Sequence, residues 1–515
     1  MRTENSLKNV FWSVFAFGIN LVVNFVARKF FIDILGAEYN GLNSLLTSII
    51  SILSIAELGI GTTIIFFLYE PIHKHDIELT KSLMSFYKKC YRIIAAVVSI
   101  VGLIIVPFLP SIIGSIDIDV NIYIAYILFL SEAVFSYLLS YKRSIIIADQ
   151  KERITKYVHI GKIILMNVIQ ILLLYFTKNF YLFLLIKIIF TSLENIVIAG
   201  IANLRYPYIT EKAEPLPALI KKNLTKKIRA MFYHQIGGFV VNGTDNIMIS
   251  MMFGVTQVGF YNNYFLVVTS VFNLINSVFS GITASIGNLL VTKSERSSLY
   301  TYRGIQAINF VLAVYVSCTF YVCVQPLVKI WIGDEYLMSE LMVGVLAIYL
   351  YLKMMKLTTI AFKNAAGIFY EDRFIPIVES IVNIIASIVC AKIFGISGII
   401  MGTIISTLVL YFGSYPFIVY RKVFKTSVGG YFRQHLTYLI LAAIFGVAVI
   451  TLSGITTLQS PVLELIKNAI ISTLFFCVIF VILYFSNSSF EDIIVRILKK
   501  FFRKRNNKYR REKRI

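Results

Sequence analysis

Long apolar runs recur along the chain and constrain its fold more than any other feature. Of the 515 residues, 58% are hydrophobic and 15% are charged. Many runs reach the roughly 20 residues that a helix needs to cross a bilayer. The alternating apolar and polar strands of outer-membrane barrels are absent from the sequence. The sequence therefore predicts an all-α, multi-pass membrane protein.

The apolar runs divide into fourteen predicted transmembrane helices. Short polar or glycine-containing segments separate neighbouring runs, and the shortest of these segments are residues 177–179 and 395–398. The predicted spans are residues 9–33, 43–69, 92–112, 120–141, 157–176, 180–202, 231–253, 260–290, 305–330, 338–360, 375–394, 397–420, 436–454 and 465–485.

Basic residues are concentrated in every second loop, which predicts the orientation of the chain. The net charge of +22 lies in short loops and in the C-terminal tail. This distribution matches the positive-inside rule, so both termini are expected in the cytoplasm and no nucleic-acid partner is expected. The basic loops lie near residues 74–89, 142–153, 221–229, 293–303, 363–373 and 421–425, and the opposite loops carry Glu38, Asp117, Asp119, Asp334 and Glu335.

One short pattern occurs twice, 218 residues apart. Val22-Val23-Asn24 is followed by Gly36 and Gly41, and Val240-Val241-Asn242 is followed by Gly254 and Gly259. In each copy an apolar helix with a central Asn leads to a turn bounded by glycines and then to another apolar helix. Five identities at one offset in the same context indicate an internal duplication.

The duplication predicts the domain organisation. The offset encloses six spans, an even number, so the two copies have the same orientation in the membrane, as in parallel repeats. Two spans and a basic tail follow the second copy. The predicted parts are a six-helix lobe at 1–203, a cytoplasmic linker at 204–229, a second six-helix lobe at 230–425, two extra helices at 426–486 and a cytoplasmic tail at 487–515.

The tail combines an amphipathic segment with a basic end. Phe490, Ile494, Ile497 and Phe501 fall on one helical face, and many Lys and Arg residues follow. This pattern is typical of an interfacial helix, and the sequence predicts that the tail binds anionic lipids.

No catalytic signature or cofactor motif is present in the sequence. There is no P-loop, no HExxH motif and no His/Cys cluster with metal-ligand spacing, so no cofactor and no metal is expected. Asp117 and Asp119 form one DxD pattern in a predicted outside loop, as some membrane glycosyltransferases use to bind a metal. The predicted outside loops are short, which favours two solvated acids over a catalytic site.

Polar and ionisable residues inside the spans are the candidates for a substrate cavity, because burying them in lipid is costly. Asn20, Asn24 and Arg28 share one face of the first span, and His234, Asn242 and Asp245 share one face of the seventh. These two polar stripes are predicted to form opposite walls of one cavity. Hydrogen bonds within a lobe, snorkelling ends and structural ion pairs remain alternatives. The cavity candidates are Asn20, Asn24, Arg28, Glu57, Glu132, Lys187, Glu194, His234, Asn242, Asp245, Lys353 and Lys356.

Several short segments form a further pattern that extends over essentially the whole chain. The first is Leu35-Gly36-Ala37-Glu38-Tyr39-Asn40-Gly41-Leu42, and residues 56–61 follow it. Further segments are residues 244–249, 253–254, 258–261 and 395–398. The order and spacing of these segments resemble the Wzx-type polysaccharide flippases. The fourteen predicted spans resemble the MurJ lipid II flippases more than the commoner twelve-span Wzx pattern. The related multidrug extruders also have twelve spans.

The resemblance implies the fold of the multidrug/oligosaccharidyl-lipid/polysaccharide exporter superfamily, with two six-helix lobes that work by alternating access. It implies a flippase in a bacterial plasma (inner) membrane and no enzymatic activity. The implied substrate is an undecaprenyl-diphosphate-linked oligosaccharide, moved to the outer leaflet for capsule, O-antigen or a related polymer. A polysaccharide polymerase and glycosyltransferases are further candidate partners.

Three alternatives stay open at this point. The chain could be a membrane-embedded glycosyltransferase or polysaccharide polymerase that uses Asp117 and Asp119. It could also be a lipid II flippase or a multidrug exporter of the same superfamily. A multidrug exporter that moves cations would be expected to have an acidic cavity, whereas a flippase of lipid-linked diphosphates would need a cationic one.

Overall fold

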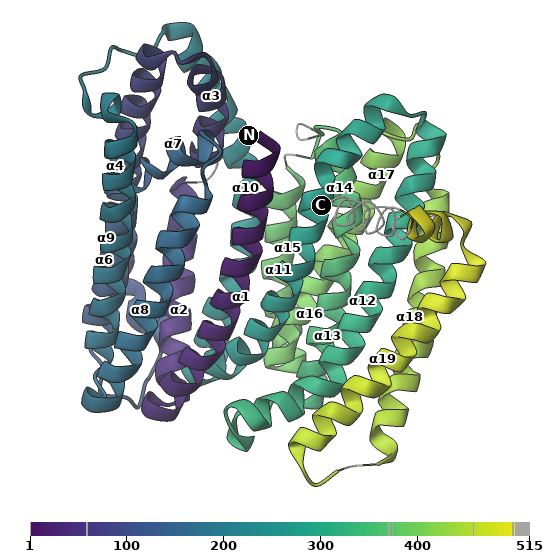
Figure 1. The fold of residues 1–515 in the computed structure, drawn as a ribbon. Helices are drawn as coiled ribbons and strands as arrows, with labels where there is room; N and C mark the ends of the chain where they lie inside the picture. The colour runs from purple at the N-terminus through teal and green to yellow at the C-terminus, as the bar shows by residue number, and fades with distance from the viewer. Residues whose placement is uncertain are drawn as a thin grey trace, which may run out of the picture. The chain divides into compact units, whose positions relative to one another are not determined.

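The computed structural model describes residues 2–57, 60–368, 371–372, 374–456, 458–496 and 499. Side chains are described for these residues except 2–11, 13–14, 55–56, 62, 230–242 and 284. The described chain consists of helices and their connections (Figure 1). It divides into two compact units, Met1–Asn262 and Asn263–Ile515. The all-α class predicted from the sequence is confirmed.

Unit 1 contains the first ten α-helices and the beginning of the eleventh. Its core is built by α6 against α9 and α4, by α8 against α1 and α9, and by α10 against α2 and α3. The elements are α1 (Arg2–Leu35), α2 (Ala37–Leu53), η1 (Ser54–Glu57), α3 (Ile60–Lys74), α4 (Ile77–Ile105), η2 (Val106–Phe108), α5 (Leu109–Ile113), α6 (Ile122–Ser140), α7 (Arg143–Ala148), α8 (Arg153–Thr177), α9 (Phe180–Arg205), η3 (Pro207–Thr210), α10 (Ala218–Phe253) and α11 (Val255–Thr292).

Unit 2 contains the rest of α11 and the helices that follow it. Helix α12 lies at its centre and contacts α13, α14, α18 and α19. The further elements are α12 (Glu295–Trp331), η4 (Asp334–Tyr336), α13 (Glu340–Met355), α14 (Leu357–Ala365), α15 (Ile375–Phe394), α16 (Ile396–Ser406), η5 (Thr407–Tyr411), α17 (Phe412–Lys422), α18 (Gly429–Ile455) and α19 (Pro461–Ser486).

The residues that separate the predicted spans end and begin the helices by ordinary capping. Lys178 has a left-handed conformation at the end of α8, and the side chain of Asn179 accepts hydrogen bonds from two backbone amides that start α9. Gly395, with φ +60°, separates α15 from α16. Both short separators predicted from the sequence are therefore confirmed.

Twelve of the fourteen predicted spans coincide with described helices that are long and apolar enough to cross a membrane. The second predicted span, 43–69, is not continuous, since α2 ends at Leu53 and a 3-10 turn follows. The seventh, 231–253, lies inside the 36-residue helix α10. Within this span the side chains are described only from residue 243 onward. Twelve of the fourteen predicted spans are therefore confirmed as helices of sufficient length and hydrophobicity. A broken helix takes the place of the second predicted span, and the seventh is part of a longer helix.

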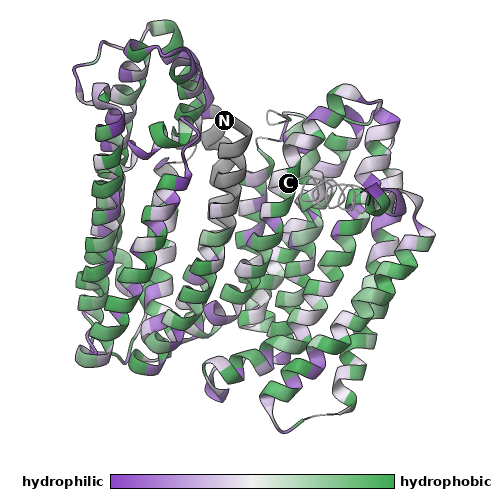
Figure 2. Ribbon diagram, in the orientation of Figure 1, coloured by the Kyte–Doolittle hydropathy of each residue, from purple (hydrophilic) through white to green (hydrophobic). Residues whose placement is uncertain are grey.

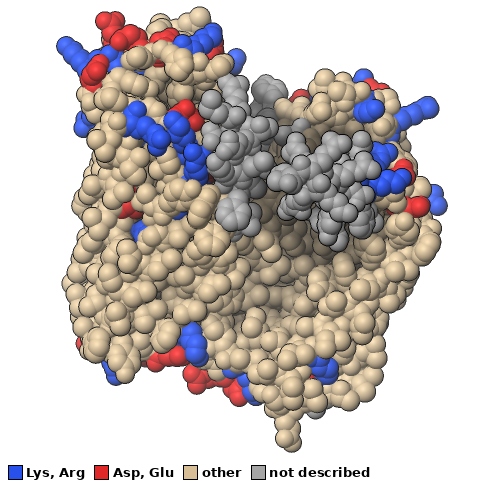
Figure 3. Space-filling view, viewed as in Figure 1, with Lys and Arg blue, Asp and Glu red and all other residues tan. Residues whose placement is uncertain are grey.

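The surface of each unit has the distribution expected of a protein in lipid. Hydrophobic residues predominate along the long helices (Figure 2), and many of them are exposed. Most charged side chains lie near the ends of the helices in the face shown (Figure 3). In α19, for example, Leu474 and Val481 are about half exposed although the helix is strongly apolar. These faces are stable only against hydrocarbon, so the chain is a multi-pass membrane protein.

The two glycine-bounded turns of the duplicated pattern have the same local structure. Gly36 joins α1 to α2 with φ +94°, and Gly254 joins α10 to α11 with φ +88°. Only glycine adopts this conformation without strain. The two turns therefore need glycine at equivalent positions, which explains two of the five identities.

The second glycines of the pattern bring the two turns into reciprocal contact within unit 1. A Cβ atom on Gly41 would lie 2.0 Å from the carbonyl oxygen of Val255. A Cβ atom on Gly259 would lie 2.4 Å from the carbonyl oxygen of Ala37. Residues 37 and 255, like residues 41 and 259, are 218 positions apart. Such an exchange of equivalent contacts is what a local two-fold axis produces, as expected for parallel repeats.

The helices outside the duplication pack on α12. The Asn468 amide of α19 donates to the carbonyl oxygen of Val322 on α12 (2.7 Å). Residues 488–496 form a further helix, and its Phe490 is fully buried beside Phe480. The phenol of Tyr300 on α12 donates to Asp492 (2.9 Å). The sequence predicted that Phe490 lies in the membrane interface. This prediction is wrong, because Phe490 packs against other parts of the protein. The basic end, residues 500–515, lies outside the described residues.

The two compact units meet at Asn262, whereas the sequence predicted that the two lobes are divided by the linker 204–229. Helix α10, which begins the second copy of the repeat, packs on α2, α3 and α5 of the first copy. The predicted lobes stay a prediction. The lysine-rich end of the linker is helical, because α10 begins at Ala218.

Candidate functional site

A polar cluster lies where the two copies of the repeat meet inside unit 1. Arg28 of α1 donates through Nη1 to the carbonyl oxygen of Asn262 on α11 (3.0 Å). The Asn262 amide donates to Oδ1 of Asn246 on α10 (2.9 Å), and the Asn246 amide donates to the hydroxyl of Ser48 on α2 (2.7 Å). We call these four residues the junction cluster.

The junction cluster contains one predicted site residue, Arg28, and three that the sequence reasoning missed. Arg28 and Asn246 are 218 positions apart, so they are equivalent in the two copies. That equivalence was a signal that could have identified Asn246. Arg28, Asn246 and Asn262 are half-buried, and Ser48 is buried.

The other residues of the two predicted stripes do not join this cluster in the described structure. Asn20 donates to the carbonyl oxygen of Ala16 on its own helix (3.1 Å). Asn24 is exposed, and Asp245 is buried on α10. The side chains of His234 and Asn242 lie outside the described part of the chain. The cavity predicted between the stripes therefore stays a prediction.

Glu132 and Lys187, which were predicted separately, form one ion pair in the middle of unit 1. Lys187 Nζ on α9 lies 3.0 Å from Glu132 Oε2 on α6. The Thr191 hydroxyl donates to the other carboxylate oxygen (3.2 Å), and the Lys187 ammonium lies 4.9 Å from the centre of the Phe129 ring. This arrangement corresponds to the structural alternative, a Glu–Lys pair within one lobe.

Glu194 lies at the centre of a second charged group, the Glu194 cluster. Its side chain is 6% exposed and accepts from Arg143 Nη2 at 2.7 Å. His159 Nδ1 lies 3.1 Å away, and Lys162 Nζ lies 3.5 Å away. Helix α7 supplies Arg143, and α8 supplies His159 and Lys162 one turn apart. The sequence reasoning missed these three partners, because only the tertiary fold brings α7 and α8 to α9.

Glu57 ends the 3-10 turn that interrupts the second predicted span. Its carboxylate accepts a hydrogen bond from the Tyr91 hydroxyl of α4. The Tyr87 hydroxyl, one turn away, donates to Tyr91 (3.0 Å). The break in the helix therefore places a carboxylate in a tyrosine-lined, mostly buried environment.

Lys356 lies at a second irregularity, in unit 2. It separates α13 from α14, and its side chain faces the π-helical turn Thr407–Tyr411. Lys356 Nζ lies 3.8 Å from Glu379 on α15 and donates to the hydroxyl of Thr407 (3.2 Å). Turns of this type often occur at functional positions. The N–O distance of 3.8 Å makes this a loose ion pair.

Lys353, one turn before Lys356, has a different environment. Its ammonium group donates to the Tyr349 hydroxyl (2.9 Å) and lies 5.7 and 4.6 Å from the ring centres of Phe265 and Phe272 on α11. Among the described residues no carboxylate forms an ion pair with Lys353. Lys353 is half-buried. We call this group the Lys353 aromatic cluster.

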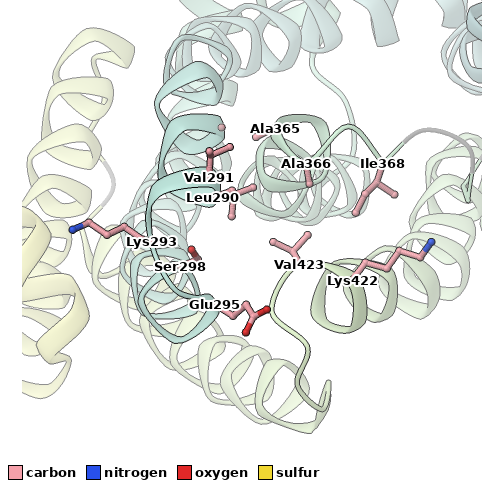
Figure 4. A pocket seen from close by; sticks show the side chains of 11 residues that line it. Leu290, Val291, Lys293, Glu295, Ser298, Ala365, Ala366, Ile368, Lys422 and Val423 are labelled. Carbon is pink, nitrogen blue, oxygen red and sulfur yellow. The ribbon is translucent and has the colours of Figure 1, made fainter.

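A pocket of about 450 Å³ opens at one end of unit 2, apart from all predicted site residues. It lies where the α11–α12 turn meets the ends of α14 and α17, and Lys293 and Lys422 extend away from it on opposite sides (Figure 4). The exposed Glu371 carboxylate accepts a hydrogen bond from Lys422, which lowers the pKa of Glu371. Lys293 and Lys422 at the pocket belong to loops predicted to be cytoplasmic.

The DxD pattern does not build a metal site among the described residues. The backbone amide of Asp117 donates to the Glu38 carboxylate (2.8 Å). No group of three His, Cys, Asp or Glu side chains in the described chain could hold a metal ion.

Comparisons with known proteins identify the fold. No protein-family model matches the chain, and no curated protein sequence matches it significantly. Among solved structures, an inward-closed lipid II flippase MurJ matches with a TM-score of 0.67 and 13% identity, over 93% of this chain and 99% of that one. An inward-facing multidrug resistance MATE family transporter of the MOP superfamily matches with a TM-score of 0.61 and 14% identity, over 77% and 93%.

A third solved structure agrees with these two. The Vibrio cholerae MATE transporter VcmN in its bent form matches with a TM-score of 0.52 and 13% identity, over 82% of this chain and 98% of that one. The chain therefore has the fold of MOP-superfamily transporters and flippases, as the resemblance implied. At these identities the likeness concerns the fold.

Proposed function

We propose that the chain is a flippase that moves a polyprenyl-diphosphate-linked oligosaccharide across a bacterial plasma membrane by alternating access. The observation that carries the proposal is that one cation in the membrane-spanning helices, Lys353, has no carboxylate partner among the described residues. Glu132, Glu194 and Glu379 each face a cationic side chain, whereas Lys353 contacts aromatic rings and a phenol. A cation without a carboxylate partner suits an anionic ligand.

The Lys353 aromatic cluster matches the two chemical parts of such a substrate. An ammonium group binds phosphate oxygens through charge-assisted hydrogen bonds. The rings of Phe265 and Phe272 offer apolar faces against which the carbon-bound hydrogens of a sugar ring can pack. A drug cation would instead be repelled by Lys353, which argues against the multidrug exporter alternative.

The membrane potential can drive the proposed movement. The potential is negative inside and is worth about 2.3 kcal/mol per charge per 100 mV. A diphosphate with two charges would gain roughly 4.6 kcal/mol on moving outward. Transport of this direction therefore needs no nucleotide hydrolysis.

A lipid II flippase is the second candidate function. The match to MurJ covers a larger share of this chain than the match to the MATE transporter, 93% against 77%. Both candidate substrates carry a polyprenyl diphosphate, so the Lys353 aromatic cluster fits each. The two differ in the glycan, which the described residues do not specify.

Depletion of the protein in its source bacterium tests the function. If the proposal is correct, a lipid-linked oligosaccharide accumulates in the cytoplasmic leaflet and the surface polymer is lost. If lipid II accumulates and growth stops, the second candidate replaces the first. Normal surface polymer in a strain without another flippase would contradict both candidates.

A further inference from the structure

The lysine-rich end of the predicted linker forms an ordered face on helix α10. In the first turns of α10, Lys221, Lys222, Lys226 and Arg229 are all exposed. At 3.6 residues per turn they fall within an arc of roughly 140° on one side of the helix. We call these four residues the basic face. A flexible loop with the same composition would not align its charges in this way.

The opposite side of the same turns is fixed to unit 1. Leu224 is fully buried, and Ile220 and Ile228 beside it are half-buried. The ammonium group of Lys227 lies 3.3 Å from the centre of the Phe66 ring on α3. Apolar burial and this cation–π contact hold α10 in one rotation, so the basic face points away from the protein core.

The four cations of the basic face differ in their partners from other lysines of unit 1. Within the described residues none of them forms an ion pair with a carboxylate. By contrast, Lys74 and Lys81 of the same unit are paired with Glu70 and Glu78. Four aligned cations without counter-ions repel one another, and an anionic partner would relieve this repulsion.

The length of α10 places the basic face at the level of the lipid head groups. The helix has 36 residues and is therefore about 54 Å long, whereas the hydrocarbon core is about 30 Å thick. The basic face ends at Arg229, directly before the predicted span 231–253. Its first residue, Lys221, lies about 15 Å from the start of that span along the helix axis. It lies on the side of the membrane predicted to be cytoplasmic, where anionic lipids attract basic segments.

We propose that the basic face of α10 is a docking surface for anionic phospholipid head groups of the cytoplasmic leaflet. It is separate from the binding predicted for the C-terminal tail and does not depend on the proposed flippase function. Because α10 is one continuous helix from Ala218 to Phe253, a head group bound there would hold the end of the membrane-spanning segment that carries Asp245 and Asn246.

The test uses the full-length protein in proteoliposomes of phosphatidylcholine with a small fraction of spin-labelled phosphatidylglycerol. One variant replaces all four cations by Gln: Lys221→Gln, Lys222→Gln, Lys226→Gln and Arg229→Gln. A matched control keeps the charge: Lys221→Arg, Lys222→Arg, Lys226→Arg and Arg229→Lys. The measured quantity is the preference of the protein for phosphatidylglycerol over phosphatidylcholine.

The four-Gln variant is expected to lose between about tenfold and about 600-fold of the preference attributable to this site at low salt, since each of the four cations near the surface contributes up to roughly fivefold. The charge-keeping control should retain the preference, and added salt should reduce it in the wild type. Unfolding in pure phosphatidylcholine should be equal for all three proteins. An unchanged preference in the four-Gln variant would overturn the proposal.

A second arm separates phospholipid from substrate. If a polyprenyl diphosphate displaces the labelled phosphatidylglycerol from the wild type, and the four-Gln variant loses transport without losing phosphatidylglycerol, the face is a substrate entrance and the proposal is wrong. If phosphatidylglycerol preference falls and polyprenyl-diphosphate binding is unchanged, the proposal is supported. The second result is independent of whether the protein transports its substrate.

Discussion

The charged groups embedded in unit 1 and unit 2 differ in how completely they are neutralised. In unit 1, Glu132 has one lysine partner at 3.0 Å, and Glu194 has three basic partners. In unit 2, the pair of Lys356 and Glu379 is loose, and Lys353 has no carboxylate partner among the described residues. The difference indicates that Glu132 and Glu194 serve mainly the structure of unit 1, whereas under the proposed function Lys353 of unit 2 is left for a ligand. Two groups lie outside this comparison: Glu57 of unit 1, which accepts from Tyr91, and the buried pair of Lys363 and Asp372 in unit 2.

This contrast matters because burial alone does not separate a structural charge from a functional one. Lys187 and Lys353 are both half-buried lysines in membrane helices, and both lie near aromatic rings. The sequence makes them equivalent candidates. Their partners distinguish them, because a carboxylate lies 3.0 Å from Lys187, while the described contacts of Lys353 are a phenol and aromatic rings.

The strongest test of the structural role is the Glu194 cluster. Glu194→Ala would leave Arg143 and Lys162 without their shared carboxylate in a membrane-embedded position. We expect a loss of about 3–5 kcal/mol in the free energy of unfolding, measured in detergent micelles. A loss of transport with unchanged stability would show that unit 1 also uses embedded charge for function.

The pair of Glu132 and Lys187 gives a smaller effect and an internal control. Lys187→Met is expected to cost about 2 kcal/mol of unfolding free energy, because Glu132 stays behind without its partner. The double variant with Glu132→Gln should recover at least about 1 kcal/mol of this loss. Additive losses in this double-mutant cycle would contradict the structural interpretation of the pair.

Lys353 is predicted to behave in the opposite way. Lys353→Gln should change the free energy of unfolding by less than about 1 kcal/mol. It should reduce transport about tenfold, which corresponds to about 1.4 kcal/mol. The matched variant Lys353→Arg keeps the charge and should keep most of the transport. Equal activity of the Gln and Arg variants would remove Lys353 from the proposed site.

The loose pair of Lys356 and Glu379 should show the smallest coupling. Since its N–O distance is 3.8 Å, we expect a coupling energy of about 0.5 kcal/mol between Lys356→Met and Glu379→Gln. The measurement is the same double-mutant cycle as for unit 1. A coupling above that of Glu132 and Lys187 would reverse the comparison between the units.

The sequence predicted best what depends on local structure. Asn179 and Gly395 at the two short separators have the capping and backbone conformations that their residue types favour. The repeat offset of 218 residues recurs in space as the reciprocal contacts of Gly41 and Gly259. These features depend on a few neighbouring residues, or on one repeated pattern, and can therefore be read without a fold.

The partners of the site residues could not be predicted in the same way. Arg143 was assigned only to a basic loop, yet it binds Glu194, which is 51 residues further along the chain. The aromatic rings at Lys353 come from α11, more than 80 positions earlier in the chain. An apolar membrane sequence contains many aromatic residues, so nothing in the sequence indicates which of them meets a given lysine.

The most direct test of the central claim is translocation by the purified protein in proteoliposomes. A polyprenyl-diphosphate-linked oligosaccharide with a fluorescent sugar is placed in both leaflets, and a membrane-impermeant reductant that quenches the fluorophore irreversibly is added outside. The account predicts that the wild type and Lys353→Arg give complete quenching, because all substrate reaches the outer leaflet, whereas Lys353→Gln slows the second half about tenfold. Protection of half the fluorescence with the wild type, as in empty liposomes, would contradict the proposed function.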